Sequence, residues 1–155
     1  MKLHADRHAD LNAITAYGDG WVEVSSVRHH GALLVRPQGP VLPWDVTDFS
    51  ALTPDILLAL AGPEIMGTRP ADGTAYHATS GTTDGTADDA PSFPRPEVIL
   101  LGTGSRLHFP HPSLTHPLQL AGIGLEAMDT VAACRTYNIL MAEGRQVLAA
   151  LLPTA

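Results

Sequence analysis

Cysteine is almost absent from this sequence, because Cys134 is the one thiol in 155 residues. A single cysteine excludes an intrachain disulfide and leaves the chain without a thiolate metal site of its own. We therefore expect a reducing compartment. Aromatic residues are also scarce, at 5% of the chain, whereas 45% of the residues are hydrophobic.

Positively charged residues are also few. The chain has nine Lys and Arg residues and sixteen Asp and Glu residues, which gives a net charge of −7. Such a balance disfavours nucleic acid and anionic lipid as partners. No stretch approaches the roughly 18 uninterrupted apolar residues of a membrane span, and the first residues lack the apolar core of a signal peptide. We expect no direct membrane insertion and a cytoplasmic protein, at most peripheral to a membrane through a partner.

The length fits one domain, residues 1–155, which would bury roughly 70% of its unfolded surface. Residues 68–97 depart from the rest in composition, since small polar residues, glycine, proline and aspartate dominate there. Such a segment cannot offset the entropy of its own ordering. We predict a flexible insertion loop on the surface, with a substrate lid as the less favoured alternative.

Short apolar runs in the first third of the chain predict antiparallel strands. The runs 13–17 and 21–25 flank Gly18-Asp19-Gly20, which is typical of a hairpin. A further strand is predicted over 31–36, and an edge segment over 41–44, where proline is tolerated. A helix over 54–61 follows, capped by Asp48 or Thr53.

The last third alternates strand and helix. Val98 to Leu101 is a fully apolar run between Pro96 and Gly102, which indicates a central strand. A helix from about residue 112 or 113 to 121 then leads to a strand over 124–128, so these two strands should be parallel. Periodicity leaves 146–152 open between a strand and a helix. Together the two parts predict an α/β fold, a mixed β-sheet flanked by helices.

Asp129 is a natural N-cap for a helix that runs to about Glu143, with Gly144 just beyond its end. One face of this helix is apolar, formed by Ala133, Cys134, Tyr137, Leu140 and Met141. Cys134 lies on that face, and we expect a buried, inert thiol.

The turn after the central strand suggests an anion site. Small residues allow backbone N–H groups to converge at Gly102-Thr103-Gly104, and Arg106 adds a cation. The third glycine of a dinucleotide fingerprint is missing, and a tight turn forced by packing is the favoured alternative. If a pocket exists, it lies where this turn meets the next helix. Its candidate residues are Gly102, Thr103, Gly104, Arg106, Asp129, Thr130 and Arg135.

The sequence gives little support for a metal site or a catalytic site. His108, His111 and His116 are interleaved with prolines and lack the spacing of metal ligands on a helix, so we expect no metal and no cofactor. No pair of nucleophile and base stands out, and we assign no catalytic residue. Arg135 and Asn138 lie one turn apart and can instead bond each other or nearby loop carbonyls.

Three motifs resemble a small single-domain family of unknown function that includes the mitochondrial NADH dehydrogenase (complex I) assembly factor 3. The motifs are Val98-Ile99-Leu100-Leu101-Gly102-Thr103-Gly104, Gly122-Ile123-Gly124-Leu125-Glu126-Ala127-Met128-Asp129-Thr130 and Ala132-Ala133-Cys134-Arg135-Thr136-Tyr137-Asn138-Ile139-Leu140. The Arg-Thr-Tyr-Asn stretch is the specific part. The resemblance covers about 13–66 and 96–152, and the family usually lacks the 68–97 insertion.

This resemblance implies a three-layer α/β arrangement around a mixed sheet. It also implies a non-enzymatic assembly or interaction protein whose partners are respiratory-complex subunits or another assembly factor. No catalytic residues are established for the family, so none are transferred to this chain. The alternative is a binder of small molecules or anions, or an enzyme, that uses the pocket at 102–106 and the start of the 129–143 helix.

Overall fold

The computed structural model describes residues 10–62 and 94–154. Residues 68–93 of the predicted insertion loop lie outside these ranges, whereas residues 94–97 are described and lead into a buried strand. The buried strands belong to a five-stranded mixed sheet with the order β5-β4-β8-β6-β7. Its members are β4 (Leu33–Val35), β5 (Leu42–Pro43), β6 (Val98–Gly102), β7 (Gly124–Met128) and β8 (Val147–Leu151).

The five-stranded sheet contains both parallel and antiparallel strand pairs. β6, β7 and β8 are parallel, and β4 pairs antiparallel with both β8 and β5. The predicted parallel passage from β6 to β7 is therefore confirmed, as is the short edge segment at β5. The undecided segment 146–152 contains strand β8, which is buried at all five positions.

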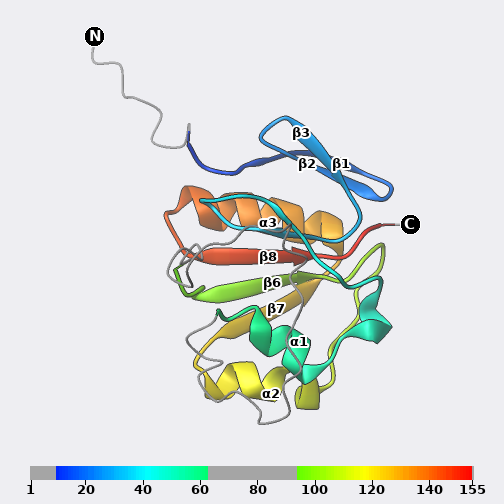
Figure 1. The fold of residues 1–155 in the computed structure, drawn as a ribbon, viewed down its shortest axis with the longest axis vertical. Helices are drawn as coiled ribbons and strands as arrows, with labels where there is room; N and C mark the ends of the chain where they lie inside the picture. Colours follow the sequence, from blue (N-terminus) through cyan, green and yellow to red (C-terminus); the bar gives the residue numbers. More distant parts are fainter. Residues whose placement is uncertain (1–9, 63–93, 155) are drawn as a thin grey trace, which may run out of the picture.

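Helices cover both faces of this sheet (Figure 1). α3 (Thr130–Ala142) lies on one face, and α1 (Pro54–Ala59) and α2 (Pro112–Leu120) lie on the other. Alternate residues of the strands divide between the two cores, as the two-residue repeat of a strand requires. Leu100 packs toward α3, whereas Ile99 and Leu101 pack toward α1 and α2. The predicted three-layer α/β fold is confirmed.

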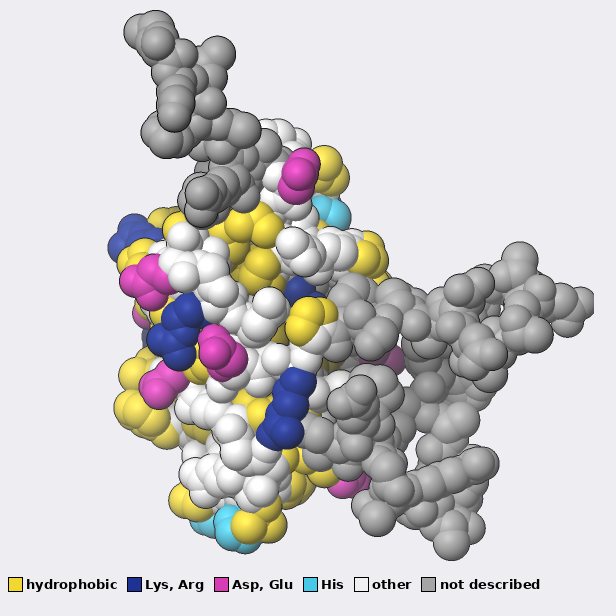
Figure 2. Space-filling model, turned by 90° about the vertical axis from the view of Figure 1, so that its left-hand side faces the viewer, with side chains coloured by type: hydrophobic (Ala, Val, Ile, Leu, Met, Phe, Trp, Pro, Cys, Tyr) yellow, Lys and Arg dark blue, Asp and Glu magenta, His cyan; other side chains and the backbone are white. Residues whose placement is uncertain are grey.

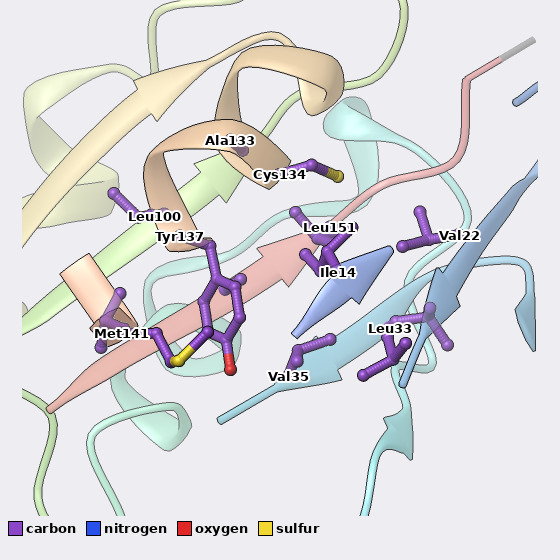
Figure 3. Close-up of a cluster of buried hydrophobic side chains, with 13 residues drawn as sticks. Ile14, Val22, Leu33, Val35, Leu100, Ala133, Cys134, Tyr137, Met141 and Leu151 are labelled. Carbon is purple, nitrogen blue, oxygen red and sulfur yellow. The ribbon is translucent and has the colours of Figure 1, made fainter. Parts of the chain in front are cut away.

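The first three strands form a separate antiparallel sheet that packs beside α3 (Figure 1). These are β1 (Ile14–Gly18), β2 (Trp21–Val24) and β3 (Val27–His30). The hairpin of β1 and β2 is confirmed, but β3 was not predicted. Figure 3 shows Ile14 and Val22 from this sheet in one cluster with Cys134 and Tyr137 of α3.

Side-chain caps define where the helices begin. The Asp129 carboxylate accepts a bond from the Ala132 N–H at 2.9 Å, so the predicted cap of α3 is confirmed. Thr53 caps α1, whereas Asp48 caps the short 3-10 turn Phe49–Ala51 that precedes it. The end of α1 was predicted at Ala61, two residues late, because the last turn tightens and the Ala61 N–H bonds the Leu58 carbonyl.

Candidate functional site

The turn after β6 meets the start of α3, as predicted, through direct hydrogen bonds. The Gly104 N–H donates to the Thr130 hydroxyl, and the Thr130 N–H donates to the Gly104 carbonyl, both at 2.9 Å. The Thr130 hydroxyl in turn donates to the Leu152 carbonyl at 2.6 Å. Thr130 is buried, at 2% exposure, so this network joins the ends of β6 and β8 to α3 away from water.

The glycines of this turn are required by space and by backbone angle. A Cβ on Gly102 would lie 3.0 Å from the Thr130 hydroxyl and 3.1 Å from the Thr130 Cα, which is tighter than ordinary packing. Gly104 has φ +96°, a region that favours glycine. Packing and local geometry therefore account for the Gly-x-Gly pattern without a ligand.

Thr103 shapes the loop that follows. Its hydroxyl lies 2.6 Å from the Arg106 carbonyl and 3.1 Å from the Met128 carbonyl, and it accepts a bond from the His108 N–H at 3.0 Å. The Thr103 N–H also donates to the Met128 carbonyl at 2.8 Å. One side chain thus holds both ends of the segment 103–108.

An open hollow of about 770 Å³ lies beside this loop, at the carboxyl ends of β6 and β8. It is lined by Thr103, Gly104 and Arg106 and by the segment 47–50. The ring of His108 stacks on that of Phe49, with centroids 5.0 Å apart and 21° between the planes.

The charges of the hollow are balanced. Bonds from the Ser50 hydroxyl and N–H lower the pKa of the Asp48 carboxyl, so this group is ionised at neutral pH. Arg106 is the cation among the lining residues. The hollow therefore offers a carboxylate and a guanidinium, both at its surface.

Four predicted members of the pocket do not line this hollow, namely Gly102, Asp129, Thr130 and Arg135. Asp129 caps α3 by accepting from the Ala132 N–H, and the Thr130 N–H is bonded to the Gly104 carbonyl, so these amides are engaged within the chain. The Arg135 Nε donates to the Tyr17 hydroxyl at 3.2 Å, on the side of α3 that meets β1. Among the described residues, no three His, Cys, Asp or Glu side chains are grouped as metal ligands.

The stretch Arg135 to Asn138 attaches the three-stranded sheet to α3, a role that the sequence did not indicate. The Asn138 amide accepts from the Ile14 N–H at 2.9 Å and donates to the Ile14 carbonyl at 2.7 Å. The Tyr137 hydroxyl donates to the Asn12 carbonyl at 2.7 Å. The side chains thus join α3 to residues more than a hundred positions earlier, and no local pattern reveals such partners.

Exposed apolar side chains lie within and directly after the loop that Thr103 holds. Phe109 is 79% exposed and Leu107 is 46% exposed. Aromatic residues are enriched in protein–protein interfaces, so Phe109 is a candidate contact for a partner.

Two features bear on partners other than proteins: the distribution of charge on one face of the molecule and the character of its helices. Figure 2 shows a face on which basic and acidic side chains are interspersed among apolar ones, without a continuous field of one sign. In residues 10–62 and 94–154, no helix combines the length and apolar character that a membrane crossing requires.

Known proteins show what this chain is similar to. The NADH dehydrogenase (ubiquinone) 1 alpha subcomplex assembly factor 3 of Mus musculus is 42% identical over 60 residues, which cover 39% of this chain and 32% of that protein. The match therefore spans about a third of that relative's length. An uncharacterised protein of Rhodobacter capsulatus is 30% identical over 141 residues, covering 90% of this chain and 83% of that one.

A solved structure shares the fold, and a family model spans most of the chain. The solution structure of a Bordetella pertussis protein, a Mth938-like domain, superimposes with a TM-score of 0.69 at 44% identity. It covers 99% of this chain and 92% of that one. The resemblance stated from the sequence motifs is thereby confirmed. Because its model matches residues 14–152, the chain belongs to the family described as a protein of unknown function (DUF498/DUF598).

Proposed function

We propose that this chain is a non-enzymatic assembly factor that binds a protein of a respiratory complex or another assembly factor. The observation that carries the proposal is its similarity to assembly factor 3, at 42% identity over 60 residues. Exposed Phe109 and Leu107, on a loop held by Thr103, support a protein partner, because a rigid loop loses little entropy on binding. As part of this proposal the chain works in the cytoplasm, at most peripheral to a membrane through its partner.

Deletion of the gene in the organism that encodes the chain tests this function. We expect less fully assembled NADH:quinone oxidoreductase on native gels, an accumulated subassembly, and a tagged chain that co-purifies with subunits of that subassembly. Phe109→Ser should weaken the co-purification and leave the melting temperature unchanged, because the ring is solvent-exposed. Normal amounts of the assembled complex in the deletion strain would contradict the proposal.

A second candidate function rests on the hollow beside Arg106. Its volume of about 770 Å³ is within the range of small-molecule sites, and it lies at the carboxyl edge of parallel strands, where α/β sheets bind ligands. We propose that a small anion would be held there by Arg106, with Thr103 and Gly104 forming the adjacent wall. The turn amides contribute little, since those of Thr103 and Gly104 are already bonded within the chain.

A thermal-shift screen of metabolites, nucleotides and common anions separates the two functions. A ligand at a hundred times its dissociation constant adds about 2.7 kcal/mol of stability, which is detectable in a domain of this size. Arg106→Ala should abolish the shift. Arg135→Ala is the matched control, because its guanidinium bonds Tyr17 and does not line the hollow. A screen without any saturable shift would exclude this second function for the compounds tested.

A further inference from the structure

Among the described residues, β7 is an edge strand whose outer row of backbone groups has no neighbouring strand. Gly124 and Met128 bond toward β6, because the Gly124 N–H donates to the Glu97 carbonyl at 3.4 Å and the Met128 carbonyl accepts from Thr103 at 2.8 Å. In a parallel ladder every second residue bonds to the same neighbour. Leu125 and Ala127 therefore direct their N–H and C=O groups away from β6.

Nothing among residues 10–62 and 94–154 bonds these outward groups of Leu125 and Ala127. The other edge of the sheet differs, because β5 is only two residues long. Within the described parts of the chain, the five-residue β7 is thus the longer edge and the one that could pair with a further strand. Edge strands of this kind are open to pairing with another chain unless they are blunted.

Glu126 lies between the two open residues and is exposed. Its carboxylate forms no ion pair with a described residue, since the salt bridge in these parts of the chain joins Arg145 and Glu97. A charge in the middle of an edge strand repels a strand that places a like charge opposite it. A second copy that paired about Glu126 would place two carboxylates opposite each other.

We propose that the outer edge of β7 binds an extended segment of a partner protein that carries a lysine or arginine opposite Glu126. The inference rests on the proposed function only in taking the occupant to be a partner protein. Four hydrogen bonds to the N–H and C=O groups of Leu125 and Ala127 hold the segment, and the pair with Glu126 selects it. The residues beside the basic one are apolar, because the side chains of Leu125 and Ala127 are half-buried on the α2 side of the sheet.

The probe is a short capped peptide with one lysine between two valines and a threonine at each side, titrated into the ¹⁵N-labelled chain. The matched peptide has glutamate in place of lysine. We expect amide shifts and slower hydrogen exchange at Leu125 and Ala127, and binding of the lysine peptide that is about five- to tenfold tighter. The preference should invert in Glu126→Lys, which no unrelated binding site would produce.

Ala127→Pro is a further variant for this edge. The Ala127 N–H does not bond β6, so proline removes one outward donor and leaves the ladder intact, as edge strands tolerate. We expect peptide binding to be lost with the five-stranded sheet preserved. If this variant fails to fold, the inverted peptide preference expected for Glu126→Lys still tests the proposal.

Three outcomes would overturn the inference. Equal binding of the two peptides, or no binding of either, would mean that Glu126 only protects the edge from aggregation. Self-association of the unmodified chain through β7, measured by sedimentation, would replace the basic segment with a second copy. None of these three results bears on the gene-deletion experiment, so a failure of the β7 proposal and a failure of the proposed assembly function are distinguishable.

Discussion

Replacement of Asn138 by alanine should weaken the attachment of the three-stranded sheet to α3. The amide makes two hydrogen bonds to the backbone of Ile14, at 2.9 and 2.7 Å, and both are partly buried. Such a bond contributes about 1 kcal/mol net, and a buried group left without a partner costs about 1–3 kcal/mol. Because Asn138→Ala leaves one donor and one acceptor without that partner, we expect the free energy of unfolding to fall by about 2–4 kcal/mol.

Thermal unfolding followed by circular dichroism measures this loss. A domain of this size loses about 2–4 °C of melting temperature per kcal/mol, so Asn138→Ala should unfold about 5–15 °C earlier. Hydrogen exchange gives a local readout, since the Ile14 amide should lose its protection while the amides of β6 keep theirs.

Two variants isolate the hydrogen bonds from packing. Asn138→Leu keeps the same branched arrangement of heavy atoms without polar groups, so it should destabilise the chain as much as alanine does. Ile139→Ala changes the neighbouring residue, which is 60% exposed, and should alter the free energy of unfolding by less than about 0.5 kcal/mol. A melting temperature for Asn138→Ala that matched the Ile139→Ala control would refute the reasoning.

Three further predictions concern buried residues of β6 and α3. Burial raises the pKa of the Cys134 thiol to about 12, so a soluble thiol reagent at neutral pH should label it only after denaturant unfolds the chain. Gly102→Ala should lower the free energy of unfolding by about 1–3 kcal/mol in urea titrations, because the added Cβ would press on Thr130. Gly124→Ala is the control and should be tolerated, since the nearest atom to its added Cβ lies at 3.9 Å. Thr130→Val loses a buried donor and a buried acceptor, and should cost about 2–4 kcal/mol by the same titration.

Local signals were sufficient for most of the mixed sheet and its helices. The carboxylate of Asp129 and the left-handed Gly144, with φ +78°, mark the ends of α3 in the sequence itself. The apolar run from Val98 between Pro96 and Gly102 likewise marked β6. These elements are set by residues within a few positions of each boundary, which is why sequence patterns predict them.

β3 could not be predicted, because its turn and its burial give no such signal. Ser25 and Ser26 take positive φ values of 48° and 67°, which a tight hairpin turn requires but which usually indicate Asn or Gly. Val27 to His30 is mostly exposed, so no alternation of apolar and polar residues appears. The strand forms through its pairing with β2, and that partner is visible only in three dimensions.

The segment 146–152 could not be assigned from sequence because strand β8 within it is fully buried, whereas β3 is mostly exposed. All of β8 is buried between the two helical layers, so both faces are apolar and the two-residue period disappears. At the candidate site, the contact between Gly104 and Thr130 was predictable because parallel strands end at one edge. The bond of Arg135 to Tyr17 was not, since 118 positions separate the two residues.

The most specific part of the resemblance therefore explains the fold more directly than it explains a function. Arg135, Tyr137 and Asn138 each bond the segment that contains or precedes β1, so this stretch is required to hold the three-stranded sheet on α3. We expect a relative that shares these residues to share that attachment, whatever it binds. In the described parts of the chain, the features for which we propose a role in recognition lie outside this attachment: the exposed Phe109, and the outward backbone of β7 on either side of Glu126.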